Sequence, residues 1–134
     1  MASSPDTSAP ASGVARAHRI LALLFLAGGV IQFVLAGYSA FGGSNWKAHE
    51  GFGSLLTAVA LIVLILAFVG RRVALQASAV LFVLMLVQQG LGAAGTDVPV
   101  LGALHPLNGL ILLAVAMLAA AGRPVRFGPP HRTA

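Results

Sequence analysis

The chain has 134 residues, of which 58% are hydrophobic and only 8% are charged. Soluble domains carry roughly 25% charged residues, so this composition excludes a soluble globular protein and indicates an integral membrane protein. The chain contains no cysteine, which excludes disulfide bonds, iron–sulfur clusters and thiolate metal sites.

The first 18 residues are rich in Ser, Ala and Pro, and we interpret residues 1–18 as a disordered cytoplasmic tail. A cleaved signal peptide is the alternative interpretation. However, the apolar stretch that starts at Ile20 runs for about 22 residues, whereas the apolar region of a signal peptide has about 7–15. We therefore expect this stretch to be the first transmembrane helix.

Four apolar stretches follow one another, and each is close to the ~20 residues that a helix needs to cross a hydrocarbon core of ~30 Å. They are about 20–41, 51–70, 73–92 and 100–122. Their long apolar runs do not alternate with polar residues, which favours helices over the strands of a barrel. Because the loops are short, successive helices should be antiparallel neighbours. We predict an all-α, up-down-up-down four-helix bundle over residues 19–122.

The bundle should consist of two tandem helical hairpins, about 20–70 and 73–122, followed by a cytoplasmic tail over residues 123–134. Gly42-Gly43-Ser44-Asn45 and Gly70-Arg71-Arg72 read as turns. Pro106 has no amide hydrogen and fits best in a first helical turn, which would place His105 near the start of the fourth helix.

The distribution of basic residues between the two ends of the predicted bundle indicates its orientation in the membrane. Seven of the eight basic residues lie on one side of the predicted bundle, and only Lys47 lies on the other. This is the positive-inside pattern, so we expect a multi-pass protein of the cytoplasmic membrane with both termini in the cytoplasm. A basic rim that faces anionic lipid headgroups accounts for the net charge of +5, and we do not expect nucleic acid as a partner.

The two hairpins are copies of each other. Gln32 and His49 lie 17 residues apart, and so do Gln88 and His105, at an offset of 56 residues. Four matched positions in each copy recur every three to four residues and therefore share one face of a helix. These positions are His49, Gly53, Leu56 and Ala60 in the first copy and His105, Gly109, Leu112 and Ala116 in the second.

The repeated histidines predict a symmetric site. Both should lie at one depth near the extracytoplasmic surface, on diagonal helices roughly 12–14 Å apart. Two imidazoles with one metal between them fit that span, whereas two bare imidazoles should not touch across it. Gly53 and Gly109 lie one turn deeper and should leave room for a flat macrocycle, so we hypothesise a haem b with His49 and His105 as axial ligands of the iron.

A structural interpretation competes with this one. Histidines at helix starts also contact headgroups, and glycines in membrane helices also permit close packing. Gln32 and Gln88 lie within apolar helices, where an unpaired amide costs several kcal/mol. They should face the bundle interior, either to form an interhelical hydrogen bond or to contact a cofactor or quinone headgroup.

The remaining polar residues give weaker signals. Gln89 has no counterpart, because position 33 is Phe, and it is either a second polar contact or faces the membrane interface. We expect His18 to be interfacial and His131 to be solvated. No catalytic triad, phosphate-binding loop or dinucleotide-binding motif is present in the sequence.

The segments His49-Glu-Gly-Phe-Gly53 and His105-Pro-Leu-Asn-Gly109 resemble in position and helix phase the haem-binding segments in one half of heme A synthase, a cytochrome b-like four-helix bundle. The chain as a whole is similar to small four-helix membrane proteins of high-GC actinobacteria. The resemblance implies a haem-binding fold over residues 20–122. It does not extend to the enzyme's chemistry, because a second four-helix unit is missing.

The functional hypothesis is one-electron transfer or haem handling at the extracytoplasmic face, with the bilayer and a membrane redox partner or quinone as partners. The alternative is a cofactor-free accessory or scaffold protein. A small transporter or quinone-binding protein is the third interpretation, and it is disfavoured as a transporter because no buried acidic residue marks an ion path.

Overall fold

The described part of the chain forms four α-helices, and each is long and apolar enough to cross a membrane. The computed structural model describes residues 9–43, 46–70 and 74–125, with side chains from residue 13 onward. The helices are α1 (Ala9–Ala40), α2 (Lys47–Val69), α3 (Leu75–Ala94) and α4 (Pro99–Ala120). The chain is therefore an all-α, multi-pass integral membrane protein, as the composition predicts.

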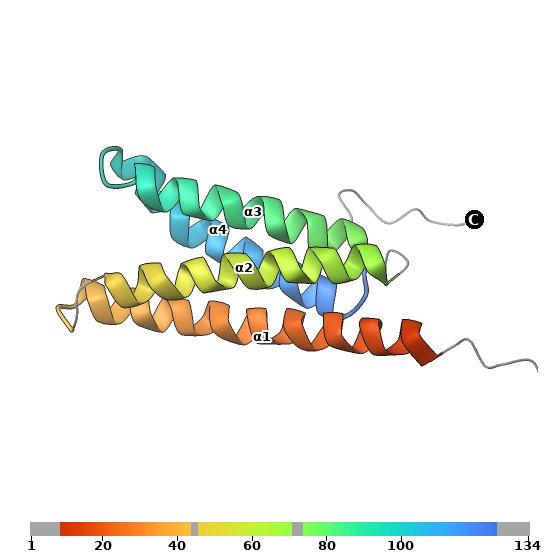
Figure 1. The fold of residues 1–134 in the computed structure, drawn as a ribbon. Coiled ribbons are helices and arrows are strands. Elements are labelled where there is room, and N and C mark those ends of the chain that lie inside the picture. Colours follow the sequence, from red (N-terminus) through yellow and green to blue (C-terminus); the bar gives the residue numbers. More distant parts are fainter. Residues whose placement is uncertain (1–8, 44–45, 71–73, 126–134) are drawn as a thin grey trace, which may run out of the picture.

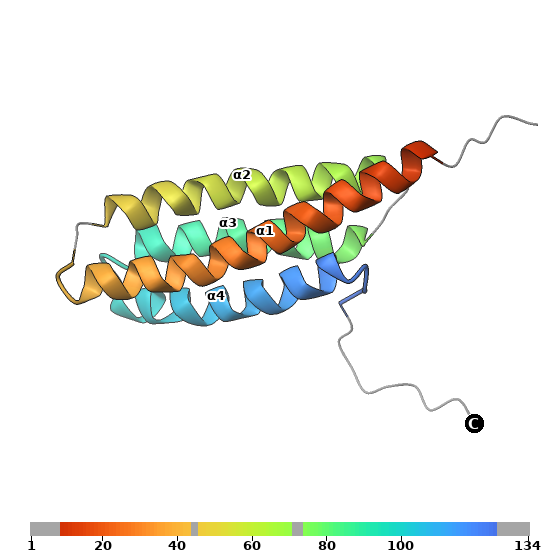
Figure 2. The same cartoon turned by 90° about the horizontal axis from the view of Figure 1, so that it is seen from below.

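The helices form an antiparallel bundle. Helices that follow one another in the chain are neighbours, and α1 also lies beside α4, which closes the bundle (Figures 1 and 2). Among the described residues, no α-carbons within 8 Å join the diagonal pairs α1/α3 and α2/α4. The predicted up-down-up-down four-helix bundle is confirmed.

The two ends of the bundle differ in their residues. The histidine end, on the left in Figure 1, holds His49, His105 and the α1–α2 and α3–α4 connections. The arginine end, on the right, holds Arg16 and Arg19 near the start of α1 and Arg123 after α4. Four further arginines assigned to this end, Arg71, Arg72, Arg126 and Arg132, lie outside the described residues.

The predicted helical stripe forms the centre of the core. Leu56, Ala60, Leu112 and Ala116 are all buried, with 5% or less of their surface exposed, and Gly53 and Gly109 are buried as well. The glycines and alanines among these positions let the helix backbones approach closely, which favours packing between helices in lipid. Many other large apolar side chains, such as Val34, Phe68 and Met117, are exposed on the outside of the bundle, as expected for a surface in contact with lipid.

The start of α1 differs from the prediction. Residues 9–18 are helical, whereas their composition predicts a disordered tail. Alanine has the highest helix propensity, and a proline at the second helical position suits a first turn, so the composition of this segment is compatible with a helix. Residues 1–8 of the predicted tail lie outside the described residues.

The start of α4 also differs. The helix begins at Pro99, which takes the first position, so Pro106 lies inside the helix rather than in its first turn. The missing amide hydrogen of Pro106 removes the bond that would reach the carbonyl of Gly102. His105 consequently lies well inside α4 and not near its start.

Candidate functional site

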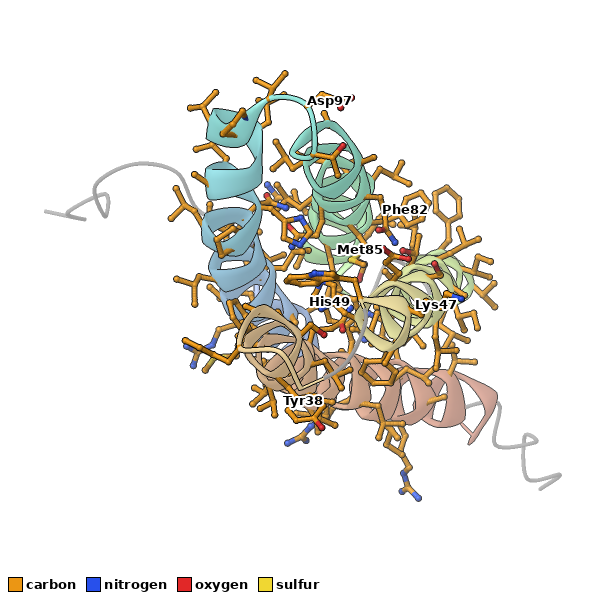
Figure 3. The ribbon with its side chains drawn as sticks, turned by 90° about the vertical axis from the view of Figure 1, so that its left-hand side faces the viewer. Tyr38, Lys47, His49, Phe82, Met85 and Asp97 are labelled. Atoms are coloured by element: carbon orange, nitrogen blue, oxygen red, sulfur yellow. The ribbon has the colours of Figure 1, made fainter. Side chains whose placement is uncertain are left out.

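The two repeated histidines meet inside the bundle. The ring centres of His49 and His105 are 6.0 Å apart, with 61° between the ring planes, although α2 and α4 are diagonal. Figure 3 looks onto the histidine end and shows His49 between the helices, while Lys47 points away from them. The prediction that bare imidazoles do not touch is wrong, because both rings extend toward the bundle axis and together cover much of the span.

One hydrogen bond recurs in both halves. His49 Nδ1 donates to the backbone oxygen of Gln32 at 3.3 Å, and His105 Nδ1 donates to the backbone oxygen of Gln88 at 3.0 Å. A carbonyl oxygen only accepts, so Nδ1 of each ring carries the hydrogen and Nε2 carries the lone pair. Each half thus fixes the same tautomer of its histidine.

The second half adds a network around His105. The side-chain amide of Gln88 donates to His105 Nε2 at 3.1 Å. Asn108 Nδ2 lies 2.7 Å from the amide oxygen of Gln88 and 3.0 Å from the backbone oxygen of Leu84, and it donates to both. Gln88 is therefore held at both of its amide atoms, and it contacts both nitrogens of the His105 ring.

The first half lacks this network. The amide nitrogen of Gln32 donates to the backbone oxygen of His49 at 3.0 Å rather than to its ring. The amide oxygen of Gln32 is buried and has no hydrogen-bond partner in the described part of the chain. The counterpart of Asn108 is Phe52, which cannot donate to it. The first half therefore presents an unsatisfied acceptor.

The repeated glycines make room for the glutamines. A Cβ atom on Gly53 would lie 2.8 Å from the amide nitrogen of Gln32. A Cβ atom on Gly109 would lie 3.1 Å from the Phe33 ring and 3.5 Å from the amide nitrogen of Gln88. The space beside both glycines is thus filled by neighbouring side chains rather than open beneath the imidazole rings.

Three further polar residues belong to the site: Gln89, expected to be either a second polar contact or interfacial, and Thr57 and Asn108, to which the sequence assigned no role. Gln89 Nε2 donates to Thr57 Oγ1 at 2.8 Å, and Thr57 Oγ1 donates to the backbone oxygen of Gly53 at 3.1 Å. Asn108 holds Gln88, as described above. A signal was available in the repeat itself: Gln89 and Asn108 replace Phe33 and Phe52 of the first copy.

A cavity of about 950 Å³ opens among these residues. All six residues predicted for the site line it, together with apolar side chains such as Phe25, Met85 and Leu113. The α2 and α3 ribbons diverge toward this end in Figure 1. Ligand sites typically measure about 300–1,000 Å³ and combine an apolar lining with a few polar groups, so the cavity is large enough for an organic cofactor.

The donor set restricts which metal fits. No group of three or more His, Asp or Glu residues in the described ranges is placed to hold a metal ion. A bare ion such as zinc takes three or four protein ligands. Two imidazoles alone suit a metal whose remaining ligands belong to a macrocycle, as in haem.

Another buried histidine lies at the arginine end. His18 is only 1% exposed, so the prediction of an interfacial residue is wrong. Its Nε2 donates to Ser78 Oγ at 2.9 Å, and Ser78 Oγ donates to the backbone oxygen of Ala74 at 3.0 Å. The bond links α1 to α3 across the bundle. His131 lies outside the described residues.

Comparison with known proteins assigns no activity. A model of a family of unknown function, DUF6220, matches residues 32–94. This segment includes Gln32, His49 and Gln88 but ends before α4. No curated protein and no solved structure matches the chain, and nothing links it to heme A synthase or to actinobacteria.

Proposed function

We propose that the chain binds one haem b between His49 and His105, for one-electron transfer or haem handling at the extracytoplasmic face of the cytoplasmic membrane. The observation that carries this proposal is the repeated bond from Nδ1 to a backbone carbonyl. In metal-binding histidines, the ring nitrogen that does not bind the metal usually donates its hydrogen to a carbonyl or carboxylate oxygen. This bond orients the ring and leaves the other nitrogen for the metal.

The spacing of the rings supports the same conclusion. A metal lies about 2.0–2.1 Å from an imidazole nitrogen. Two imidazole nitrogens that bound the same metal would therefore be at most roughly 4 Å apart, and their ring centres would be somewhat farther apart. The observed 6.0 Å between ring centres is compatible with this arrangement. When bound, a haem supplies a reversible one-electron couple.

Backbone carbonyls, apolar side chains and side-chain amides of the protein each have a role in the proposed site. The carbonyls of Gln32 and Gln88 hold the imidazoles in one tautomer. The apolar part of the cavity lining would lower the polarity around a bound metal and so influence its reduction potential. The side-chain amides of Gln32 and Gln88 supply polar contacts at the cavity wall.

Absorption spectroscopy tests this proposal on protein purified from haem-replete cells. We expect a Soret band, and sharp α and β bands after reduction with dithionite. His49→Ala and His105→Ala should weaken or shift these bands, because each removes one ligand. Met117→Ala is the matched control, since this α4 side chain is 60% exposed on the outside of the bundle and should leave the spectrum unchanged.

A colourless but folded wild-type protein would contradict the proposal and favour a cofactor-free accessory or scaffold protein. One observation favours that alternative. In the second half, both ring nitrogens of His105 and both amide atoms of Gln88 have hydrogen-bond partners within the protein. Such a network also fixes the register of α3 against α4 without any ligand.

The proposed orientation has its own test. The chain has no cysteine, so single cysteines at position 41, where Phe41 is 94% exposed, and at position 123 report on the two ends. In intact cells, a membrane-impermeant thiol reagent should label position 41 only. Labelling of position 123 instead would reverse the orientation and place the histidine end in the cytoplasm.

A further inference from the structure

The site looks symmetric in sequence, but its two imidazoles differ in what already occupies Nε2. Nε2 of His105 accepts a hydrogen bond from the Gln88 amide. Nε2 of His49 accepts none from any described residue. We infer, on the basis of the proposed haem, that His49 is the primary ligand and that His105 is exchangeable, so that a small neutral diatomic molecule such as carbon monoxide can take its place.

The orientation of the Gln88 amide follows from its second partner. Asn108 Nδ2 donates to the amide oxygen of Gln88 at 2.7 Å, so this oxygen faces Asn108 and the amide nitrogen faces the ring. Turning the amide round would place two NH₂ groups against each other. Asn108 therefore acts as a positioning residue that keeps the donor of Gln88 on His105.

The first half shows that a glutamine at this position need not cover the ring. Gln32 directs its amide nitrogen to the backbone oxygen of His49 at 3.0 Å, and its counterpart of Asn108 is Phe52. The lone pair of His49 Nε2 is left open as a result. The difference arises from one unduplicated residue and not from the histidines or glutamines.

Gln88 and the iron compete for one lone pair. Ligation through His105 requires that Gln88 release its bond, whereas displacement of His105 by another ligand lets this bond form again. One hydrogen bond of ordinary net strength changes an equilibrium constant by about twofold to tenfold. Gln88 therefore favours the state in which the position opposite His49 is open to a small molecule.

Two measurements test the inference on the purified, haem-loaded protein. The first compares haem retention in the two histidine variants. His49→Ala removes the ligand that has no competitor, so it should bind haem about twofold to tenfold more weakly than His105→Ala. The His105→Ala protein should keep a high-spin spectrum typical of one axial ligand.

The second measurement is the affinity of the reduced protein for carbon monoxide. Wild type should bind it, with a shifted Soret band. Gln88→Leu should bind it about twofold to tenfold more weakly, because displaced His105 no longer finds a partner. Asn108→Leu should change the affinity in the same direction and is a second variant in case Gln88→Leu does not fold. Leu86→Ala is the control, since this α3 side chain is 51% exposed on the outside of the bundle and should leave the affinity unchanged.

The outcomes separate the two proposals. A colourless wild-type protein would overturn the haem proposal and this inference with it. A coloured protein whose histidine variants lose haem equally would overturn the inference alone. So would a coloured protein whose carbon monoxide affinity is the same in Gln88→Leu and Asn108→Leu as in Leu86→Ala and wild type.

Discussion

The two halves of the bundle share a backbone plan but differ in how their polar atoms are satisfied. Both place a histidine Nδ1 on the carbonyl of a glutamine 17 residues earlier. Only the second half holds its glutamine amide at both ends, whereas the first leaves the oxygen of Gln32 without a partner among the described residues. The duplicated residues thus give both halves the same bond from imidazole to carbonyl, and the unduplicated Asn108 makes the remaining polar contacts of the two halves differ.

The two halves differ in the free-energy cost of their buried polar atoms. A buried polar network whose members are all bonded makes a region rigid, whereas a buried acceptor without a donor is costly. In the second half, the ring nitrogens of His105 and the amide atoms of Gln88 therefore already have hydrogen-bond partners. The open oxygen of Gln32 and the open nitrogen of His49 make the first half the part that gains most from a ligand. Four substitutions at unduplicated positions test how far the halves differ.

The largest effect is expected at His18, whose counterpart in the second half is Ala74. His18→Ala removes a ring that is 1% exposed and its bond to Ser78. By comparison with other large-to-small core substitutions, the free energy of unfolding should fall by about 2–4 kcal/mol. The measurement is unfolding in mixed micelles as the fraction of SDS rises. Arg19→Ala, at an exposed neighbour, is the control, and equal stability of the two variants would contradict a core role for His18.

The next effect concerns the α3–α4 connection, which brings Gly95 against Gly102. A Cβ atom on Gly95 would lie 2.6 Å from the Cα of Gly102, and backbone atoms cannot move aside cheaply. Gly95→Ala should therefore destabilise the bundle by about 1–3 kcal/mol in the same unfolding assay. Gly90→Ala meets nothing within 4 Å and should be neutral or raise stability by up to about 1 kcal/mol. The first half has Ser39 where Gly95 stands, so no such glycine pair exists there.

A smaller loss is expected at Asn108. Asn108→Leu removes bonds to Gln88 and to the backbone of Leu84. Each interhelical hydrogen bond in a membrane protein contributes about 0.6 kcal/mol on average, so the loss should be about 1 kcal/mol. Leu107→Ala, at a neighbour 54% exposed, should change stability by less than about 0.5 kcal/mol. If Asn108→Leu were as stable as wild type, the hydrogen bonds of Asn108 would not stabilise the second half relative to the first.

The smallest effect is expected at Gln89, which the first half replaces with Phe33. Its amide bonds to Thr57 at 2.8 Å, and Thr57 keeps its own bond to Gly53 when Gln89 is removed. A double-mutant cycle of Gln89→Leu and Thr57→Val should give a coupling energy of about 0.6 kcal/mol. A coupling energy of zero would show that this link between α2 and α3 does not contribute to the difference between the halves.

Several elements follow from local pattern alone. The four spans follow from the length of the apolar stretches. The buried positions Leu56 and Ala60 on α2, and Leu112 and Ala116 on α4, follow from helical periodicity. Boundaries were harder to predict. Proline 99 and proline 106 both suit a first helical turn, and only the structure shows that α4 begins at the earlier one. The helical start of α1 does not follow from composition, because Ser, Ala and Pro content also fits a disordered segment.

The sequence also predicts some features of the candidate site, whereas others are known only from the structure. The repeat alone determined that His49 and His105, each with its glutamine and glycine, occupy equivalent places in one bundle, because covalent spacing and helix phase are properties of the chain. Only the tertiary structure decided that the rings lie 6.0 Å apart, that Gln88 covers one ring while Gln32 leaves the other open, and that His18 is buried. These features depend on which side chains from other helices compete for the same polar atoms, and that competition arises only once the four helices pack together.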